Sequence, residues 1–176
     1  MPVATYNRAN GVKKLAEELI DKYHPHLVDV KDYIGYYYRE GGQVSWGVKP
    51  TRNNPFVNKL TEGEMVTIFV VRGDWENWSM ERRLAEVDHA LCHINRTSAG
   101  KIQGENGQPV DTWEDPEEPK NWSIRKHEVE DFACIVERHG LYYGSLEKFA
   151  EVARNAPHQI TIGDVEREAE EMGNEE

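Results

Sequence analysis

The sequence predicts an α+β fold, in which a small and mostly antiparallel sheet packs against several helices. Apolar residues recur at helical spacing near the N-terminus, and short runs rich in tyrosine, valine and isoleucine follow between residues 33 and 71. Helical patterns return after residue 79. With 176 residues, of which 38% are hydrophobic, the chain is long enough for one packed domain.

The first predicted elements are a helix and a hairpin. Residues 8–23 place their apolar side chains on one side of a helix, and Pro25 ends it because proline cannot continue the hydrogen-bond ladder. Residues 33–39 and 43–48 are typical of strands. The intervening Glu-Gly-Gly at 40–42 predicts a tight turn between them.

The middle of the chain predicts a buried strand followed by a helix. Residues 65–71 form an apolar run with three valines and an isoleucine, which predicts a strand. Ser79 is a candidate N-cap for a helix over 79–96, and Glu81 in its first turn suits the helix dipole. Residues 97–121 show no periodicity, which predicts a long loop.

The C-terminal part predicts more helix. Ser123 is a second candidate N-cap, and Gly140 suits the end of the helix that follows it. The helices expected in this part of the chain cover residues 123–139, 145–154 and 163–172. We expect one domain over 1–163 and an acidic tail over 164–176.

The distribution of charge limits the possible partners. Residues 111–120 and 164–176 together carry almost all of the net charge of −11, so the rest of the chain is close to neutral. This disfavours binding of nucleic acid through a basic face. No apolar run is long enough to span a membrane, and the N-terminus lacks the apolar stretch of a signal peptide, so we expect a cytoplasmic protein.

Two histidines carry the chemistry that the sequence suggests. His89 and His93 lie four residues apart on the predicted helix 79–96, so both imidazoles can reach one tetrahedral ion. They lie nearly opposite an aliphatic stripe formed by Met80, Leu84, Val87, Leu91 and Ile94. One side of this helix can therefore pack on the core while the other presents two ligands of a Zn²⁺ ion. The alternative is that both histidines belong to a polar surface.

A third ligand has to come from elsewhere in the chain. His127 is the best candidate, with Glu128 and Glu130 as rivals. Asp131, four residues after His127, could orient its imidazole from the second shell. Glu86 lies one turn before His89, on the same side of the helix, and is another candidate for this outer layer.

The segment Ala85–His93 resembles the D-H-E-L-x-H helix of the putative phage metallopeptidase family, a group of small zincin-like proteins. The resemblance extends to residues 68–78 and 126–140 and covers roughly residues 10–143. It implies a zincin-like fold, a zinc site made by His89, His93 and most readily His127, and a peptide or protein substrate. If a phage encodes the protein, the resemblance implies a place in the host cytoplasm.

The resemblance also implies a strand that aligns substrate. In the order of elements that such a site needs, a strand beside the metal-binding helix pairs with an extended peptide. The candidates are in the apolar strand before the helix, namely Thr67, Ile68, Phe69 and Val70.

Ala90 departs from the family pattern at the most important position. In H-E-x-x-H enzymes the glutamate after the first histidine is the general base, and alanine cannot accept a proton. We therefore expect the chain as written to be inactive, with Glu86 a poorly placed substitute. Ala90 is either an introduced inactivating change or the mark of a natural pseudoenzyme. The alternatives to a peptidase are a phage binding protein directed at a host defence protein and a purely structural zinc site.

Overall fold

The computed structural model describes residues 3–127, 141 and 144–156. The chain divides into two compact units, Met1–Lys126 and His127–Glu176, and each is described on its own. Within the described residues, no helix has the length and apolarity needed to cross a membrane.

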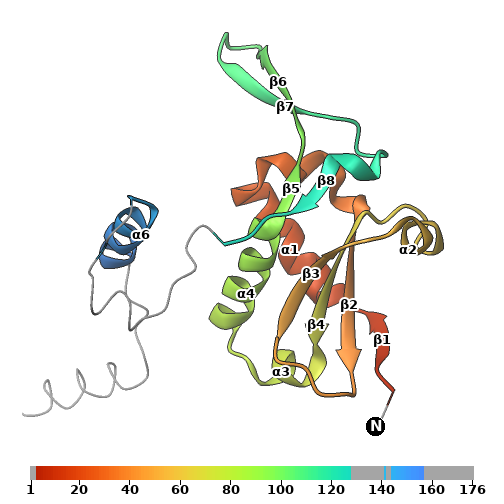
Figure 1. The fold of residues 1–176 in the computed structure, drawn as a ribbon. Coiled ribbons are helices and arrows are strands. Elements are labelled where there is room, and N and C mark those ends of the chain that lie inside the picture. The colour runs from red at the N-terminus through yellow and green to blue at the C-terminus, as the bar shows by residue number, and fades with distance from the viewer. Residues whose placement is uncertain (1–2, 128–140, 142–143, 157–176) are drawn as a thin grey trace, which may run out of the picture. The chain divides into compact units, whose positions relative to one another are not determined.

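Most elements belong to the first unit (Figure 1). In chain order they are β1 (Thr5–Arg8), α1 (Asn10–Tyr23), the 3₁₀ helix η1 (Pro25–Tyr33), β2 (Ile34–Glu40), β3 (Val48–Arg52), α2 (Pro55–Leu60), β4 (Val66–Val71), α3 (Arg72–Asn77), α4 (Met80–His93), β5 (Ile94–Arg96), β6 (Ser98–Gln103), β7 (Pro109–Trp113), the 3₁₀ helix η2 (Pro119–Asn121) and β8 (Trp122–Ile124). In the second unit the structure describes α6 (Gly144–Asn155), which confirms the helix expected at 145–154.

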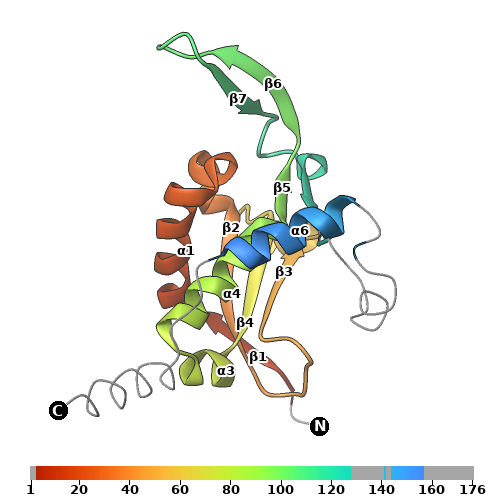
Figure 2. The same ribbon diagram turned by 90° about the vertical axis from the view of Figure 1, so that its left-hand side faces the viewer.

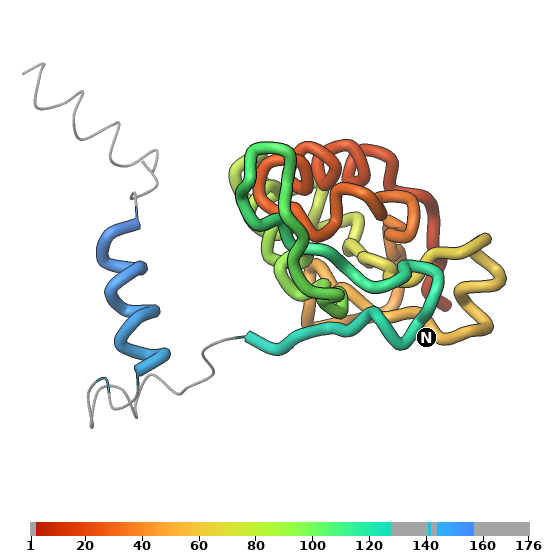
Figure 3. Tube along the Cα trace, turned by 90° about the horizontal axis from the view of Figure 1, so that it is seen from above, coloured from red at the N-terminus to blue at the C-terminus, as the bar shows by residue number. Residues whose placement is uncertain are grey.

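The main sheet has four strands in the order β1-β2-β4-β3. The pairs β1·β2 and β3·β4 are antiparallel, whereas β2 and β4 run parallel. Helices α1 and α4 lie on the same face of this sheet (Figures 2 and 3). The sheet and both helices share one core, with buried side chains that include Val12, Ile20, Tyr36, Ile68, Val70, Val87 and Leu91. This architecture confirms the α+β class with a small, mostly antiparallel sheet.

The hairpin expected at 33–48 is wrong. Residues 41–47 form a loop, and the strand that follows them begins at Val48. This strand pairs with β4 rather than with β2. The chain has to pass the end of β4 to reach the far edge of the sheet, about two strand spacings from β2. A two-residue turn cannot cover that distance, so the glycines at 41 and 42 belong to a longer connection.

The long loop expected at 97–121 is also wrong, because most of it is a second, two-stranded sheet. Strands β6 and β7 pair in antiparallel register around a turn at Gly104–Gly107. Both strands are almost entirely exposed, so neither face needs apolar residues and no alternation appears in the sequence. The hairpin extends away from the main sheet (Figure 1).

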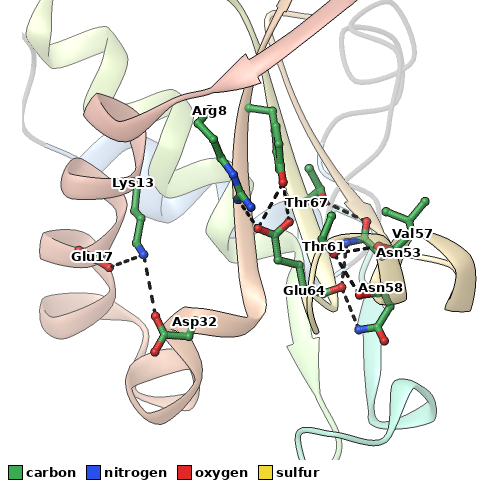
Figure 4. Close-up of polar contacts among 11 residues, drawn as sticks. Arg8, Lys13, Glu17, Asp32, Asn53, Val57, Asn58, Thr61, Glu64 and Thr67 are labelled. Carbon is green, nitrogen blue, oxygen red and sulfur yellow. Dashed lines mark hydrogen bonds and ion pairs between the residues drawn. The ribbon is translucent and has the colours of Figure 1, made fainter.

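A buried carboxylate links β1 and β2 to the residues just before β4 (Figure 4). Glu64, which precedes β4, is 6% exposed and forms an ion pair with Arg8 of β1. The Tyr37 hydroxyl donates to Glu64 Oε2 at 3.1 Å, and burial, with the carboxylate beside it, raises the pKa of that hydroxyl. The Glu64 side chain lies against Gly35 of β2, where a Cβ atom would collide with the carboxylate. Glycine is therefore required at position 35 by close packing.

We expect Gly35→Ala to destabilise the first unit by about 1–3 kcal/mol, because the new methyl group displaces a carboxylate that is held by two partners. The matched control is Gly73→Ala in α3, where a Cβ meets open space. Urea denaturation gives the free energy of unfolding of both variants. Equal stabilities of the two variants would contradict the packing described here.

Candidate metal centre

Helix α4 begins where the sequence predicts. The Ser79 Oγ accepts a hydrogen bond from the Arg82 backbone N–H at 3.3 Å, which makes Ser79 the N-cap. Hydrogen bonds from its own backbone N–H and from Ser79 hold the pKa of the exposed Glu81 carboxyl below its usual value. The helix ends at His93, three residues earlier than predicted, because residues 94–96 enter strand β5.

The faces of α4 are divided much as the helical spacing predicts. Val87 and Leu91 are fully buried against the sheet and α1, and Ile94 continues the same stripe just past the helix. Met80 was expected in that stripe but is 53% exposed, because the first turn of the helix extends past the packed layer. His89 is exposed and His93 is half-buried, as a site open to solvent requires.

The two histidines face each other at the distance that a shared metal ion requires. Their Nε2 atoms are 3.1 Å apart, and the ring centroids are 4.9 Å apart. Two nitrogen ligands at 2.0–2.1 Å from a tetrahedral ion lie about 3.3 Å apart. The pair therefore fits one ion with almost no movement of either ring.

The orientation of His93 is fixed by a residue that the sequence analysis did not identify. His93 Nδ1 lies 2.7 Å from the backbone carbonyl oxygen of Arg125. A carbonyl only accepts, so the proton of the neutral imidazole is on Nδ1, and Nε2 keeps its lone pair for a metal. The Arg125 backbone N–H donates to the His93 carbonyl at 2.8 Å, and the Arg125 Nε donates to the carbonyl of Cys92.

The helix expected at 123–139 does not start at Ser123, so this prediction is wrong at its beginning. The extended backbone there brings Arg125 to His93. Residues Trp122–Ile124 form strand β8, which pairs with β5. Trp122 is 1% exposed and donates from its indole nitrogen to the Pro116 carbonyl at 2.8 Å. Burial of this ring and pairing with β5 outweigh the local preference of Ser123 for a helix cap. Residues 128–139 of the expected helix, and the expected helix at 163–172, lie outside the described residues.

A small cavity adjoins the histidine pair. It has a volume of about 210 Å³ and lies between α4 and the edge strand β3. Its lining comprises Trp46, Gly47, Val48 and Pro50 on the sheet side, and Glu86, His89, Ala90 and His93 on the helix side. Ala90 is 3% exposed and faces this cavity together with both histidines. A longer side chain at position 90 would therefore point toward the place where a metal ion would be bound.

Of the other candidates for the metal centre, Glu86 lies beside the histidine pair, and the rest belong to the second unit. Glu86 lines the cavity and forms an ion pair with Arg82 at 3.5 Å, one turn before it. His127 is the first residue of the second unit and is not in a helix, whereas His89 and His93 both belong to the first unit. Glu128, Glu130 and Asp131 lie outside the described residues.

The strand expected to align substrate cannot do so. Thr67, Ile68, Phe69 and Val70 belong to β4, which pairs with β2 on one side and β3 on the other. Its backbone donors and acceptors are therefore already used. The edge strand beside the cavity is β3, which the sequence analysis placed too early in the chain. Pro50 in its centre was the available signal, because proline in a strand is confined mainly to edges.

We expect the neutral His93 side chain to carry its proton on Nδ1, with and without zinc, because the Arg125 carbonyl accepts from that atom. Long-range nitrogen–proton NMR correlations of the imidazole report the tautomer directly. His26 is a useful internal reference, since its Nε2 lies 3.0 Å from the Ile94 carbonyl and should show the opposite tautomer. A protonated Nε2 on His93 in the neutral state would remove the basis of this orientation.

Comparison with known proteins agrees with this geometry. No curated protein and no solved structure matches the chain. The family model described as "Putative phage metallopeptidase" matches residues 4–156, which include both histidines, the cavity and β8. A metallopeptidase family implies a metal cofactor and a peptide or protein substrate. The match confirms the resemblance suggested by the α4 sequence: the chain belongs to the putative phage metallopeptidase family.

Proposed function

We propose that the protein is a zinc-binding member of its family, built to hydrolyse peptide bonds but inactive with alanine at position 90. The observation that carries this proposal is the 3.1 Å separation of the His89 and His93 Nε2 atoms at the mouth of a cavity. His127 is the third ligand that the family resemblance implies. Three ligands leave a fourth position for water, as a catalytic site requires.

The donor set fits zinc. All the proposed ligands are imidazole nitrogens, which suit zinc, copper, iron and nickel better than calcium or magnesium. His93 has the outer contact typical of a metal ligand, a hydrogen bond from its second ring nitrogen to a main-chain carbonyl. Bound zinc would supply Lewis acidity, which activates water for attack on a peptide carbonyl.

The chain lacks a well-placed proton acceptor. Ala90 occupies the position on α4 from which the family glutamate would reach the attacking water, and a methyl group holds no proton. Glu86 is the acid that lines the cavity, but its ion pair with Arg82 draws the carboxylate toward the preceding turn. We therefore infer that loss of the base, rather than loss of the metal site, accounts for the inactivity we expect.

Strand β3 is the proposed docking edge for substrate. The Gly47 carbonyl accepts from Val71 N–H and the Asn53 N–H donates to the Met65 carbonyl, so alternate residues from 47 to 53 bond to β4. Val48 and Pro50 fall between them, and their backbone groups face away from β4. An extended peptide could pair with the Val48 N–H and with both carbonyls, directly beside the histidines.

A binding protein without catalysis is the second candidate, and Ala90 is the observation that favours it. The histidine pair, the His93 orientation and the cavity are all intact around this one substitution. A natural pseudoenzyme could retain such a site in order to hold a partner, such as a host defence protein, without cleaving it.

Introducing the missing base should separate these candidates. We expect Ala90→Glu to raise zinc-dependent peptide hydrolysis by about 10²–10⁴-fold, because a general base contributes a factor of this size. The matched control is Ala85→Glu, which adds the same side chain to an exposed position of α4 that does not line the cavity. Cleavage of a mixed peptide library, followed by mass spectrometry, gives the readout.

Hydrolysis by Ala90→Glu alone, lost again when His93→Ala is added, would support the peptidase proposal. If Ala90→Glu binds zinc and cleaves nothing, the binding protein becomes the better explanation. If the chain as written holds no stoichiometric zinc and His89→Ala leaves its metal content unchanged, the proposed metal centre itself is wrong.

The docking edge gives a separate prediction in the Ala90→Glu background. We expect Val48→Pro to lower kcat/KM about tenfold, because it removes one main-chain hydrogen bond to substrate. The fold should tolerate this change, since the Val48 N–H does not bond to β4. Val48→Ala keeps the N–H and trims the same side chain, so it should retain most of the activity. Equal rates for the two variants would argue against pairing at β3.

A further inference from the structure

Helix α4 carries a second pair of side chains of metal-ligating type, one residue out of step with the histidines. Asp88 and Cys92 are four residues apart, and each directly precedes a histidine of the first pair. Successive residues of a helix differ by about 100° in direction. The aspartate and the cysteine therefore share a neighbouring face, and both are half-buried. The sequence analysis assigned no ligand role to either of them.

A histidine from α1 completes this group. His24 is the C-cap residue of α1 and is only 4% exposed. Its Nε2 lies 2.6 Å from Asp88 Oδ1. One ligand atom from each of His24, Asp88 and Cys92 lies within 4.8 Å of the others. All three belong to the first unit, in which α1 and α4 pack side by side (Figure 2).

The surrounding backbone favours a cation at this point. His24 follows the last turn of α1, and Cys92 is the next-to-last residue of α4, so the C-terminal ends of two helices meet here. The carbonyl ends of helices carry partial negative charge. The His24 backbone is also held firmly, because its N–H donates to the Ile20 carbonyl at 3.0 Å and its carbonyl accepts from Leu27 N–H at 2.9 Å.

We propose that His24, Asp88 and Cys92 bind a second transition-metal ion, for which zinc is the best fit. Imidazole, carboxylate and thiolate are the three protein ligand types of zinc, and the thiolate argues against calcium and magnesium. A nitrogen and an oxygen ligand of one zinc ion lie about 3.3 Å apart, so the His24–Asp88 contact has to open by less than 1 Å. Without the ion, that hydrogen bond keeps two of the ligands together. The partly exposed Asp88 side chain gives the ion a route from solvent.

Cobalt substitution tests this site separately from the histidine centre. A thiolate bound to Co²⁺ gives a near-ultraviolet charge-transfer band, and the proposed ligands of the first centre include no thiolate. We expect the full chain to bind two equivalents of Co²⁺ or Zn²⁺ and to show this band. Cys92→Ser should abolish the band and lower affinity at the second site by more than about 100-fold. Cys134→Ser, which changes the other cysteine of the sequence, should leave the band intact.

The variants also separate this inference from the proposed function. His89→Ala should remove the first equivalent and retain the band, whereas Asp88→Asn should weaken the band without removing a thiol. Circular dichroism and thermal unfolding of each metal-free variant show whether it folds. No thiolate band in the unaltered chain, or a band that persists in Cys92→Ser, would overturn the second site even if the histidine centre binds zinc.

Discussion

The pairing of β5 with β8 is the interaction on which the candidate metal centre depends. It begins at the residue after His93, so the end of α4 continues directly into β5, whose partner strand β8 starts at Trp122. Burial of the Trp122 ring, with the Arg96 guanidinium 5.6 Å from its centroid, holds this strand in register. In consequence the Arg125 carbonyl is placed against His93 Nδ1. A contact between residues 32 positions apart in the chain thus sets the orientation of the His93 ring in the candidate metal centre.

A second constraint is the way α4 divides its surface. Val87 and Leu91 bury one side in the core, which turns His89 and His93 toward the cavity and Asp88 toward α1. One face of α4 packs in the apolar core, a second presents the two histidines to the cavity, and a third contacts the buried His24. Ala90 lies between the core and the cavity, so this position is only 3% exposed and also faces the proposed metal-binding place. The proposed position of the family glutamate and the packing of α4 therefore meet at this residue.

The sheet determines where a peptide could bind. Strands β2 and β4 run parallel, and the chain forms β3 between them in sequence. After β2 the chain therefore crosses to the outer edge, where it forms β3, and then comes back to form β4 between β2 and β3. The strand with the most apolar sequence, β4, becomes an interior strand, and its backbone groups are used within the sheet. The edge position goes to a strand with a proline and two basic residues, whose weaker pattern gave no reason to place it beside the metal centre.

Elements with a local pattern could be predicted from the residues alone. The span of α1, the cap of α4 at Ser79 and the histidine pair could be identified from spacing and residue type, and the family resemblance identified Ala90 in place of the glutamate. Tertiary structure decided the order of the strands, the β6–β7 hairpin, the extended backbone at Ser123 and the partners of His93 and Asp88. These features depend on contacts between distant residues and on backbone pairing, which has no residue code of its own. Helical periodicity reports which side chains face the core, but only the folded chain decides what lies opposite the others.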